Sequence, residues 1–137
     1  MSDPDRFVDT GYWIALVDRS DRYHDRARAF ARDFGGPFVT AEAVLTEVGN
    51  TLAGQRWRAA VVTLLGRIRA NPAIEILPVS AAPFGRAVDL YAARPDKEWD
   101  PTDCISFVVM QDHGIAEALA ADQHFIQAGF RALLRKP

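Results

Sequence analysis

The chain has 137 residues, the length of one ordinary domain and too short for two enzymatic domains. Apolar residues make up 49% and charged residues 25%, which excludes a disordered or collagen-like chain. The formal net charge of −2 disfavours a protein that coats nucleic acid nonspecifically. No apolar run could span a bilayer, Met1 to Asp5 is acidic and Cys104 is the only cysteine, so we expect one cytoplasmic domain over residues 1–137, with no membrane partner.

The first third of the chain predicts a strand, two helices and a second strand. Residues 6–9 are a short apolar run that ends in a carboxylate, and an apolar helix is expected over 12–17. Ser20 is a candidate cap for the next helix, which the Gly-Gly-Pro sequence at 35–37 should end. The second strand is then expected at 38–40.

The middle of the chain carries three more helical patterns and one strand. Apolar stripes over 44–52 and 57–68 predict two helices, the second of which should end at Asn71-Pro72. A strand is expected at 74–79, and Phe84, Ala87, Val88 and Tyr91 mark a further helix.

The last third is organised around one apolar helix. Asp100-Pro101 combines a helix cap with proline at the first helical position. The residues that follow, 104–110, are apolar on nearly every side, which predicts a helix inside the molecule that Gly114 closes. Two further strands are expected at 117–121 and 130–134, separated by the short segment 123–129.

Strands that alternate with helices predict a mostly parallel sheet of four to five strands with helices on both faces. Sites in such sheets form outside the carboxyl ends of the strands. Four acids are expected near that edge: Asp9 after the first strand, Asp103 at the start of the apolar helix, Asp122 after the fourth strand, and Glu47 beside a buried helix face. Such a cluster is repulsive unless protons or cations neutralise it.

An all-oxygen ligand set favours Mg²⁺ or Mn²⁺ over zinc and suits phosphodiester chemistry. Asn50 and Ser106 lie one turn beyond Glu47 and Asp103, where each could orient an acid or a water. Each acid also has a structural interpretation, and Asp9 could only start the first turn after its strand. Asp103 and Asp122 could serve as helix-end residues, Asp100 fits a cap better than a ligand, and Glu47 could be a solvated helix position.

Four segments, taken in order, resemble the PIN domain family, particularly its VapC-type toxins. The resemblance runs from about Phe7 to Leu133 and rests on the sequences FVDT at 7–10, TEV at 46–48, TDCISF at 102–107 and ALAADQHF at 118–125. Two positions depart from relatives, which often have Ser-Leu-Thr-Asp where this chain has DPTD at 100–103, and a hydroxyl before the last aspartate where it has Ala120-Ala121.

The resemblance implies a three-layer α/β/α sandwich and a Mg²⁺- or Mn²⁺-dependent endoribonuclease that leaves a 5′ phosphate. It implies an RNA substrate, a small antitoxin protein that inhibits the enzyme, and a homodimer. Carried over by position, Asp9 and Asp103 are the principal metal ligands and Glu47 is a ligand or water-positioning acid. Asp122 is the fourth acid, and Thr10 lies behind the ligands.

Other interpretations compete with a nuclease. A PIN-fold module that has lost activity and binds RNA or protein is one alternative, and a phosphoaspartyl enzyme or receiver built on Asp9 is another. Cys104 is expected to be a core residue rather than a nucleophile. His124 follows Asp122 by two residues and could approach the acidic pocket as a donor to phosphate or to a leaving group, but we expect a packed or surface histidine. Arg56 and Arg94 are candidates for binding backbone phosphates.

Overall fold

A computed structural model of the chain describes residues 5–135. Met1 to Pro4, which belong to the acidic segment considered above, and both ends of the expected 1–137 domain therefore lie outside the described residues. Among the helices of the described chain, none combines the length and the apolar character that a membrane span requires.

Five short strands form one sheet in the order β3-β2-β1-β4-β5, and every neighbouring pair is parallel. The prediction of a mostly parallel sheet is therefore confirmed. Four of the strands are shorter than the expected ranges, and the second strand is one residue longer. Their bounds are β1 Arg6–Val8, β2 Phe38–Ala41, β3 Ile74–Leu77, β4 Glu117–Leu119 and β5 Arg131–Ala132.

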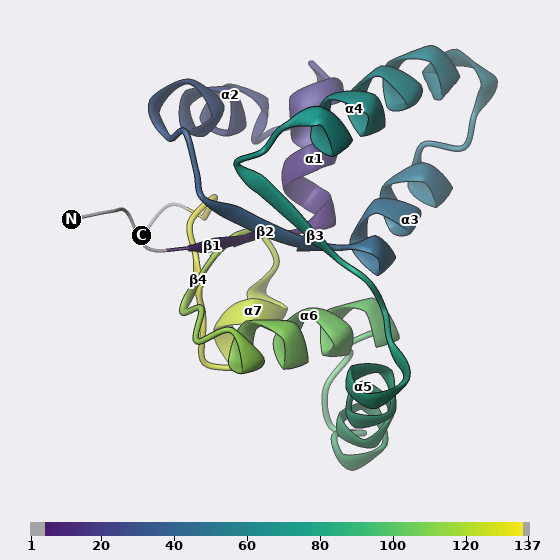
Figure 1. Cartoon of the computed structure of the whole chain (residues 1–137), viewed down its shortest axis with the longest axis vertical. Coiled ribbons are helices and arrows are strands. Elements are labelled where there is room, and N and C mark those ends of the chain that lie inside the picture. Colours follow the sequence, from purple (N-terminus) through teal and green to yellow (C-terminus); the bar gives the residue numbers. More distant parts are fainter. Residues whose placement is uncertain (1–4, 136–137) are drawn as a thin grey trace.

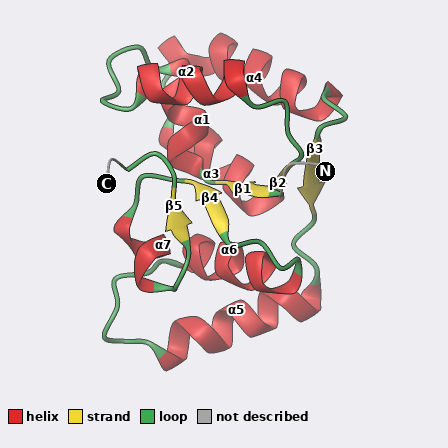
Figure 2. Ribbon diagram, turned by 90° about the vertical axis from the view of Figure 1, so that its left-hand side faces the viewer, coloured by secondary structure: helices red, strands yellow, loops and turns green. Residues whose placement is uncertain are grey.

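Helices cover both faces of the sheet, which confirms the three-layer α/β/α sandwich (Figures 1 and 2). In both views α1, α2 and α4 lie on one side of the sheet and α5, α6 and α7 on the other, while α3 contacts both α1 and α6. The helices are α1 Thr10–Val17, α2 His24–Asp33, α3 Glu42–Thr51, α4 Arg58–Ala70, α5 Ala81–Ala93, α6 Pro101–Asp112 and α7 Gln123–Gln127, and a 3₁₀ turn, η1 Gln55–Trp57, precedes α4.

Two local predictions are wrong. Ser20 does not cap α2, which begins at His24; its hydroxyl instead donates to Asp18 Oδ1 over 2.6 Å within the preceding turn. The segment 123–129 is more than a connection, because its first five residues form α7. A helix this short gives too little periodicity to be recognised in a sequence.

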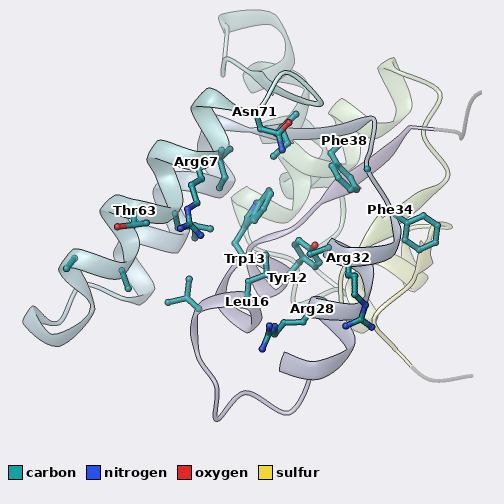
Figure 3. Close-up of a pocket in the computed structure, with 18 residues that line it drawn as sticks. Tyr12, Trp13, Leu16, Arg28, Arg32, Phe34, Phe38, Thr63, Arg67 and Asn71 are labelled. Atoms are coloured by element: carbon teal, nitrogen blue, oxygen red, sulfur yellow. The ribbon is translucent and has the colours of Figure 1, made fainter.

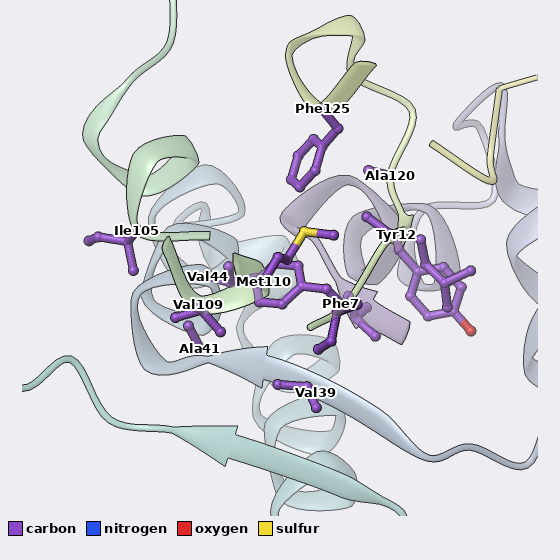
Figure 4. Close-up of a cluster of buried hydrophobic side chains, with 14 of the residues drawn as sticks. Phe7, Tyr12, Val39, Ala41, Val44, Ile105, Val109, Met110, Ala120 and Phe125 are labelled. Atoms are coloured by element: carbon purple, nitrogen blue, oxygen red, sulfur yellow. The ribbon is translucent and has the colours of Figure 1, made fainter. Parts of the chain in front are cut away.

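Helix α6 is the interior helix that its sequence predicts. Every residue from Asp103 to Met110 is buried, and the helix packs beneath the sheet in the main hydrophobic cluster (Figure 4). Phe107 lies at the centre of an aromatic group, with ring centroids 5.1 Å from Phe125 of α7 and 5.0 Å from Trp99. These contacts fix α7 against α6, and they position the residues at the start of α7.

Strands β1 and β4 are neighbours near the centre of the sheet. Between them the strand order reverses: β2 and β3 extend the sheet on one side, and β5 extends it on the other. Connections from β1 and from β4 then diverge, and this divergence leaves a crevice at the carboxyl edge. The backbone N–H of Asp9 donates to the carbonyl of Leu119 over 3.2 Å, and the buried Thr40 hydroxyl donates to the carbonyl of Val8. The residue after β1 is thereby held beside the end of β4.

The first turn of α6 is closed by a reciprocal pair of hydrogen bonds. Asp100 Oδ1 accepts from the backbone N–H of Asp103 over 2.8 Å, and Asp103 Oδ2 accepts from the backbone N–H of Asp100 over 3.1 Å. This capping box satisfies two N–H groups that the helix itself leaves unpaired, and Pro101 presets the first helical residue.

We expect Asp100→Ala to be less stable than Asp100→Asn by about 1 kcal/mol, because only asparagine keeps a side-chain acceptor for the Asp103 N–H. Both variants lack the charge of Asp100, so their difference isolates the cap. Urea denaturation followed by circular dichroism measures it, and equal midpoints for the two variants would contradict a capping role.

Candidate active site

Asp9 is a buried acid at the carboxyl edge of the sheet. It directly follows β1, precedes α1, and is only 8% exposed. Burial raises the pKa of its carboxyl to about 8; the backbone N–H of Thr10 opposes that rise, and the charges of Asp103, Glu47 and Asp122 add to it. The other three predicted acids therefore lie near enough to Asp9 for their charges to act on it.

Asp103 approaches Asp9 from the N-terminal turn of α6. The residue is also 8% exposed, and burial raises the pKa of its carboxyl to about 6, although hydrogen bonds from the Asp100 N–H and from His124 oppose the rise. The capping interpretation of Asp103 and the site interpretation are therefore compatible: one oxygen, Oδ2, serves the helix cap, while no hydrogen bond within the described chain reaches Oδ1.

Asp122 and Glu47 form the more open side of the site. Asp122 is exposed and caps α7 by accepting the backbone N–H of His124 over 2.9 Å. Glu47 is half-buried on α3 and lines a shallow hollow of about 460 Å³ together with Asn50 and Thr102. The site therefore has a buried end at Asp9 and a solvent-facing end where a long substrate can approach.

The three supporting residues occupy different places. Thr10 is buried next to Asp9, and its hydroxyl has no hydrogen-bond partner within residues 5–135. Asn50 is exposed in the hollow beside Glu47. The hydroxyl of Ser106 donates to the Thr102 carbonyl over 2.9 Å, so its hydrogen is directed to the helix backbone and not to an acid.

His124 lies beside the acids, which is the less favoured of the two interpretations given above. Its Nδ1 lies 2.9 Å from Asp103 Oδ2 and 3.3 Å from Asp122 Oδ1, and its side chain is mostly buried. The histidine therefore belongs to the acidic site. The available signal was its position two residues after Asp122, but only the turn that starts α7 directs its ring back toward Asp103.

The surroundings of two other side chains argue against the chemical roles considered for them, Cys104 as a nucleophile and Arg94 as a phosphate-binding residue. Cys104 is fully buried, and burial raises the pKa of its thiol to about 11, which suits a core residue and not a nucleophile. The guanidinium of Arg94 is already bound to both carboxylate oxygens of Asp96, over 2.9 Å each. The candidate role of Arg94 in binding phosphate is therefore weakened.

The residues of the site fit a hard divalent cation. In the described part of the chain, no lysine or arginine forms an ion pair with any of the four acids. Ligand atoms of Asp103, Asp122 and His124 lie within 4.8 Å of one another, and the partly desolvated carboxylate of Asp9 faces the same charges. Carboxylate oxygens are the ligands that Mg²⁺ and Mn²⁺ prefer.

A second hollow lies between α1, α2 and α4 and contains none of the four acids (Figure 3). This groove has a volume of about 960 Å³, and Trp13, Leu16 and Phe38 are among the apolar side chains that line it. Its charged lining residues are all arginines: Arg28, Arg32 and Arg67. We call it the arginine groove.

Sequence and structure comparisons agree on the class of protein. The PIN domain family model matches residues 6–131, and the chain belongs to the PIN domain family. It is 30% identical over 124 residues to the 23S rRNA-specific endonuclease VapC20 of Mycobacterium tuberculosis strains CDC 1551 / Oshkosh and H37Rv, covering 90% of this chain and 94% of that relative. The crystal structure of M. tuberculosis VapC20, described as a sarcin-ricin loop cleaving toxin, matches with a TM-score of 0.83 and 29% identity, covering 90% of this chain and 95% of that one.

The burial of Asp9 makes a prediction for the metal-free protein. The carboxyl ionises near pH 4 when unfolded and, with its pKa raised, near pH 8 when folded, so unfolding releases a proton between these values. Stability in EDTA should therefore fall as pH rises from 4 to 8. Asp9→Asn should lose less stability over this range, since only the smaller contribution of Asp103 remains, and it should melt at least ~3 °C above the wild type at pH 8.5, on the scale of ~1 kcal/mol.

Thermal denaturation at pH 5 and pH 8.5 measures this difference. The matched control is Asp89→Asn, which changes an exposed aspartate on α5 and should follow the wild type at both pH values. Identical pH profiles for Asp9→Asn and the wild type would mean that Asp9 is not the charge that destabilises this edge.

Proposed function

We propose that this protein is a Mg²⁺- or Mn²⁺-dependent endoribonuclease and the toxin of a toxin–antitoxin pair. The observation that carries the proposal is that the charges of Glu47, Asp103 and Asp122 act on the buried Asp9 at the switch point of the sheet, with no lysine or arginine paired to any of the four acids within residues 5–135. Membership of the PIN domain family and similarity to a ribosomal RNA endonuclease support it.

Asp9 and Asp103 would hold the cation, with Glu47 and Asp122 as further ligands or as acceptors for an attacking water. When bound, Mg²⁺ or Mn²⁺ lowers the pKa of the attacking water and neutralises charge on the phosphate and the leaving oxygen. The deep position of Asp9 keeps its carboxylate partly desolvated, which strengthens its attraction to a cation. The exposed Asp122 and the hollow beside Glu47 leave room for an RNA strand.

The substrate we propose is RNA, and the first candidate is the sarcin-ricin loop of 23S rRNA, because the similar mycobacterial toxin cleaves that loop. Cleavage by an activated water would leave a 5′ phosphate. Since an rRNA target is cytoplasmic, we propose the cytoplasm as its site of action. Homodimer formation stays a prediction.

The arginine groove is the surface we propose for the antitoxin. Its apolar lining and positive rim complement a segment that carries both apolar and acidic side chains. Arg28 and Arg67 form no ion pair within the described chain, so their charges are available to a partner. None of the four acids lines the arginine groove.

Cleavage of a sarcin-ricin loop RNA hairpin tests the enzymatic proposal. We expect cleavage with Mg²⁺ or Mn²⁺ and none in EDTA. Asp9→Asn and Asp103→Asn should each lower kcat at least ~100-fold, because each removes a charged ligand of the proposed ion. The products are separated on a denaturing gel and their ends are mapped.

Asp89→Asn is again the matched control and should cleave like the wild type. Binding of the hairpin without cleavage under any metal condition would instead favour the inactive RNA-binding module. Cleavage that survives EDTA and both ligand substitutions would contradict a metal-dependent mechanism.

Charge reversal at one position of α4 tests the antitoxin surface. Arg67 lines the arginine groove, whereas Arg69, two residues further along, lines a separate hollow with Glu42 and Ile76. We expect the small protein encoded next to this chain's gene to co-purify with the wild type and with Arg69→Glu, but at least ~10-fold less with Arg67→Glu. Equal recovery with both variants would place the partner elsewhere.

A further inference from the structure

His124 makes a specific contact with the acidic site. Its Nδ1 lies 2.9 Å from Asp103 Oδ2. An ionised carboxylate can only accept hydrogen bonds, so the Nδ1 atom carries the hydrogen in this contact. The same Oδ2 atom also accepts the backbone N–H of Asp100 over 3.1 Å. Two donors, one from Asp100 before it in the chain and one from His124 after it, therefore hold one oxygen of Asp103.

The other oxygen of Asp103 has a different environment. No hydrogen bond from the described residues reaches Oδ1. A carboxylate whose one oxygen is held by two donors can rotate little about its side-chain bonds, so the direction in which the second oxygen points is fixed. A metal-binding carboxylate benefits from this arrangement because the ligand atom is oriented before the ion arrives.

The fold in turn holds His124. Its backbone N–H donates to Asp122 Oδ1 over 2.9 Å, which fixes the start of α7. The next residue, Phe125, is fully buried against Phe107 of α6, and Gln127 accepts the indole N–H of Trp99 over 3.0 Å. The imidazole is thus positioned by buried packing on its own helix and not by its contact with Asp103 alone.

We propose that His124 is a positioning residue: its Nδ1–H holds Oδ2 of Asp103, so that Oδ1 is presented to the divalent cation. This inference rests on the proposed function. The competing role is that of a ligand, since Asp103, Asp122 and His124 offer atoms within 4.8 Å of one another. Positioning is favoured because Nδ1 is already at hydrogen-bond distance from Oδ2, and because Mg²⁺ and Mn²⁺ prefer oxygen.

Three substitutions separate the Nδ1 donor from the rest of the ring. Asparagine places an amide N–H₂ near the position of Nδ1, glutamine extends past it toward the position of Nε2, and alanine has no donor. We expect His124→Ala and His124→Gln to weaken Mn²⁺ binding, measured by calorimetry, about 10- to 100-fold. His124→Asn should recover most of that affinity.

The kinetic pattern should follow the metal affinity. At a fixed, sub-saturating Mn²⁺ concentration, His124→Ala should lower kcat on the RNA hairpin while KM for RNA stays within about twofold. The reason is that the imidazole is proposed to contact Asp103, the metal ligand, and not the RNA. His124→Asn should restore kcat. Melting temperatures in EDTA establish that the variants are folded.

Nitrogen-15 NMR of the wild type with and without Mg²⁺ provides an independent readout that requires no variant to fold. His124→Asn assigns the His124 signals among the three histidines. We expect Nδ1 to keep its hydrogen when Mg²⁺ binds. Loss of that hydrogen on metal binding would show that His124 is a ligand and overturn the positioning role.

The outcomes distinguish this inference from the proposed function. If the wild type binds Mn²⁺ and cleaves RNA but His124→Ala does so equally well, the positioning role is wrong and the nuclease stands. If the wild type neither binds Mn²⁺ nor cleaves RNA, both are wrong. Equal losses for the Asn, Gln and Ala variants would also refute the role assigned to the Nδ1 donor.

Discussion

The placement of Asp9 at the end of a central parallel strand is the constraint on which the rest of the site depends. A carboxylate there loses most of its contact with water, and it also faces the charges of Asp103, Glu47 and Asp122. The fold keeps this unfavourable arrangement because β1 and β4 are hydrogen-bonded neighbours and α6 is buried beneath them. A hard cation would neutralise this repulsion, which is why the arrangement suits the metal site proposed above.

The same few contacts serve both the fold and the site. Asp103 closes the first turn of α6 with the same oxygen, Oδ2, that His124 contacts. The hydrogen bond that caps the interior helix therefore also orients the carboxyl of Asp103. The aromatic contact between Phe107 and Phe125 joins α6 to α7 and thereby brings Asp122 and His124 to the site. Substitutions in this aromatic group should therefore disturb the acids without touching them directly.

The sequence was sufficient to predict the parallel α/β class, and it pointed to four acids whose role in the site stays a prediction. Strand–helix alternation placed Asp9 and Asp122 at one edge, and the Asp100-Pro101 cap placed Asp103 at the start of the interior helix. His124 could not be placed in the same way, because its role depends on the turn direction of a five-residue helix and on a buried aromatic contact. The arginine groove was also missed, since Arg28 and Arg67 line the same hollow only because α2 and α4 pack on the same side of the sheet.

The most direct test of the account is where a divalent ion binds. Crystals soaked in manganese and measured for anomalous scattering should contain a peak between the carboxylates of Asp9 and Asp103, with Asp122 and Glu47 facing it. A fully occupied ion elsewhere, or an empty map at this edge at millimolar manganese, would contradict the claim that these four acids form a cation site.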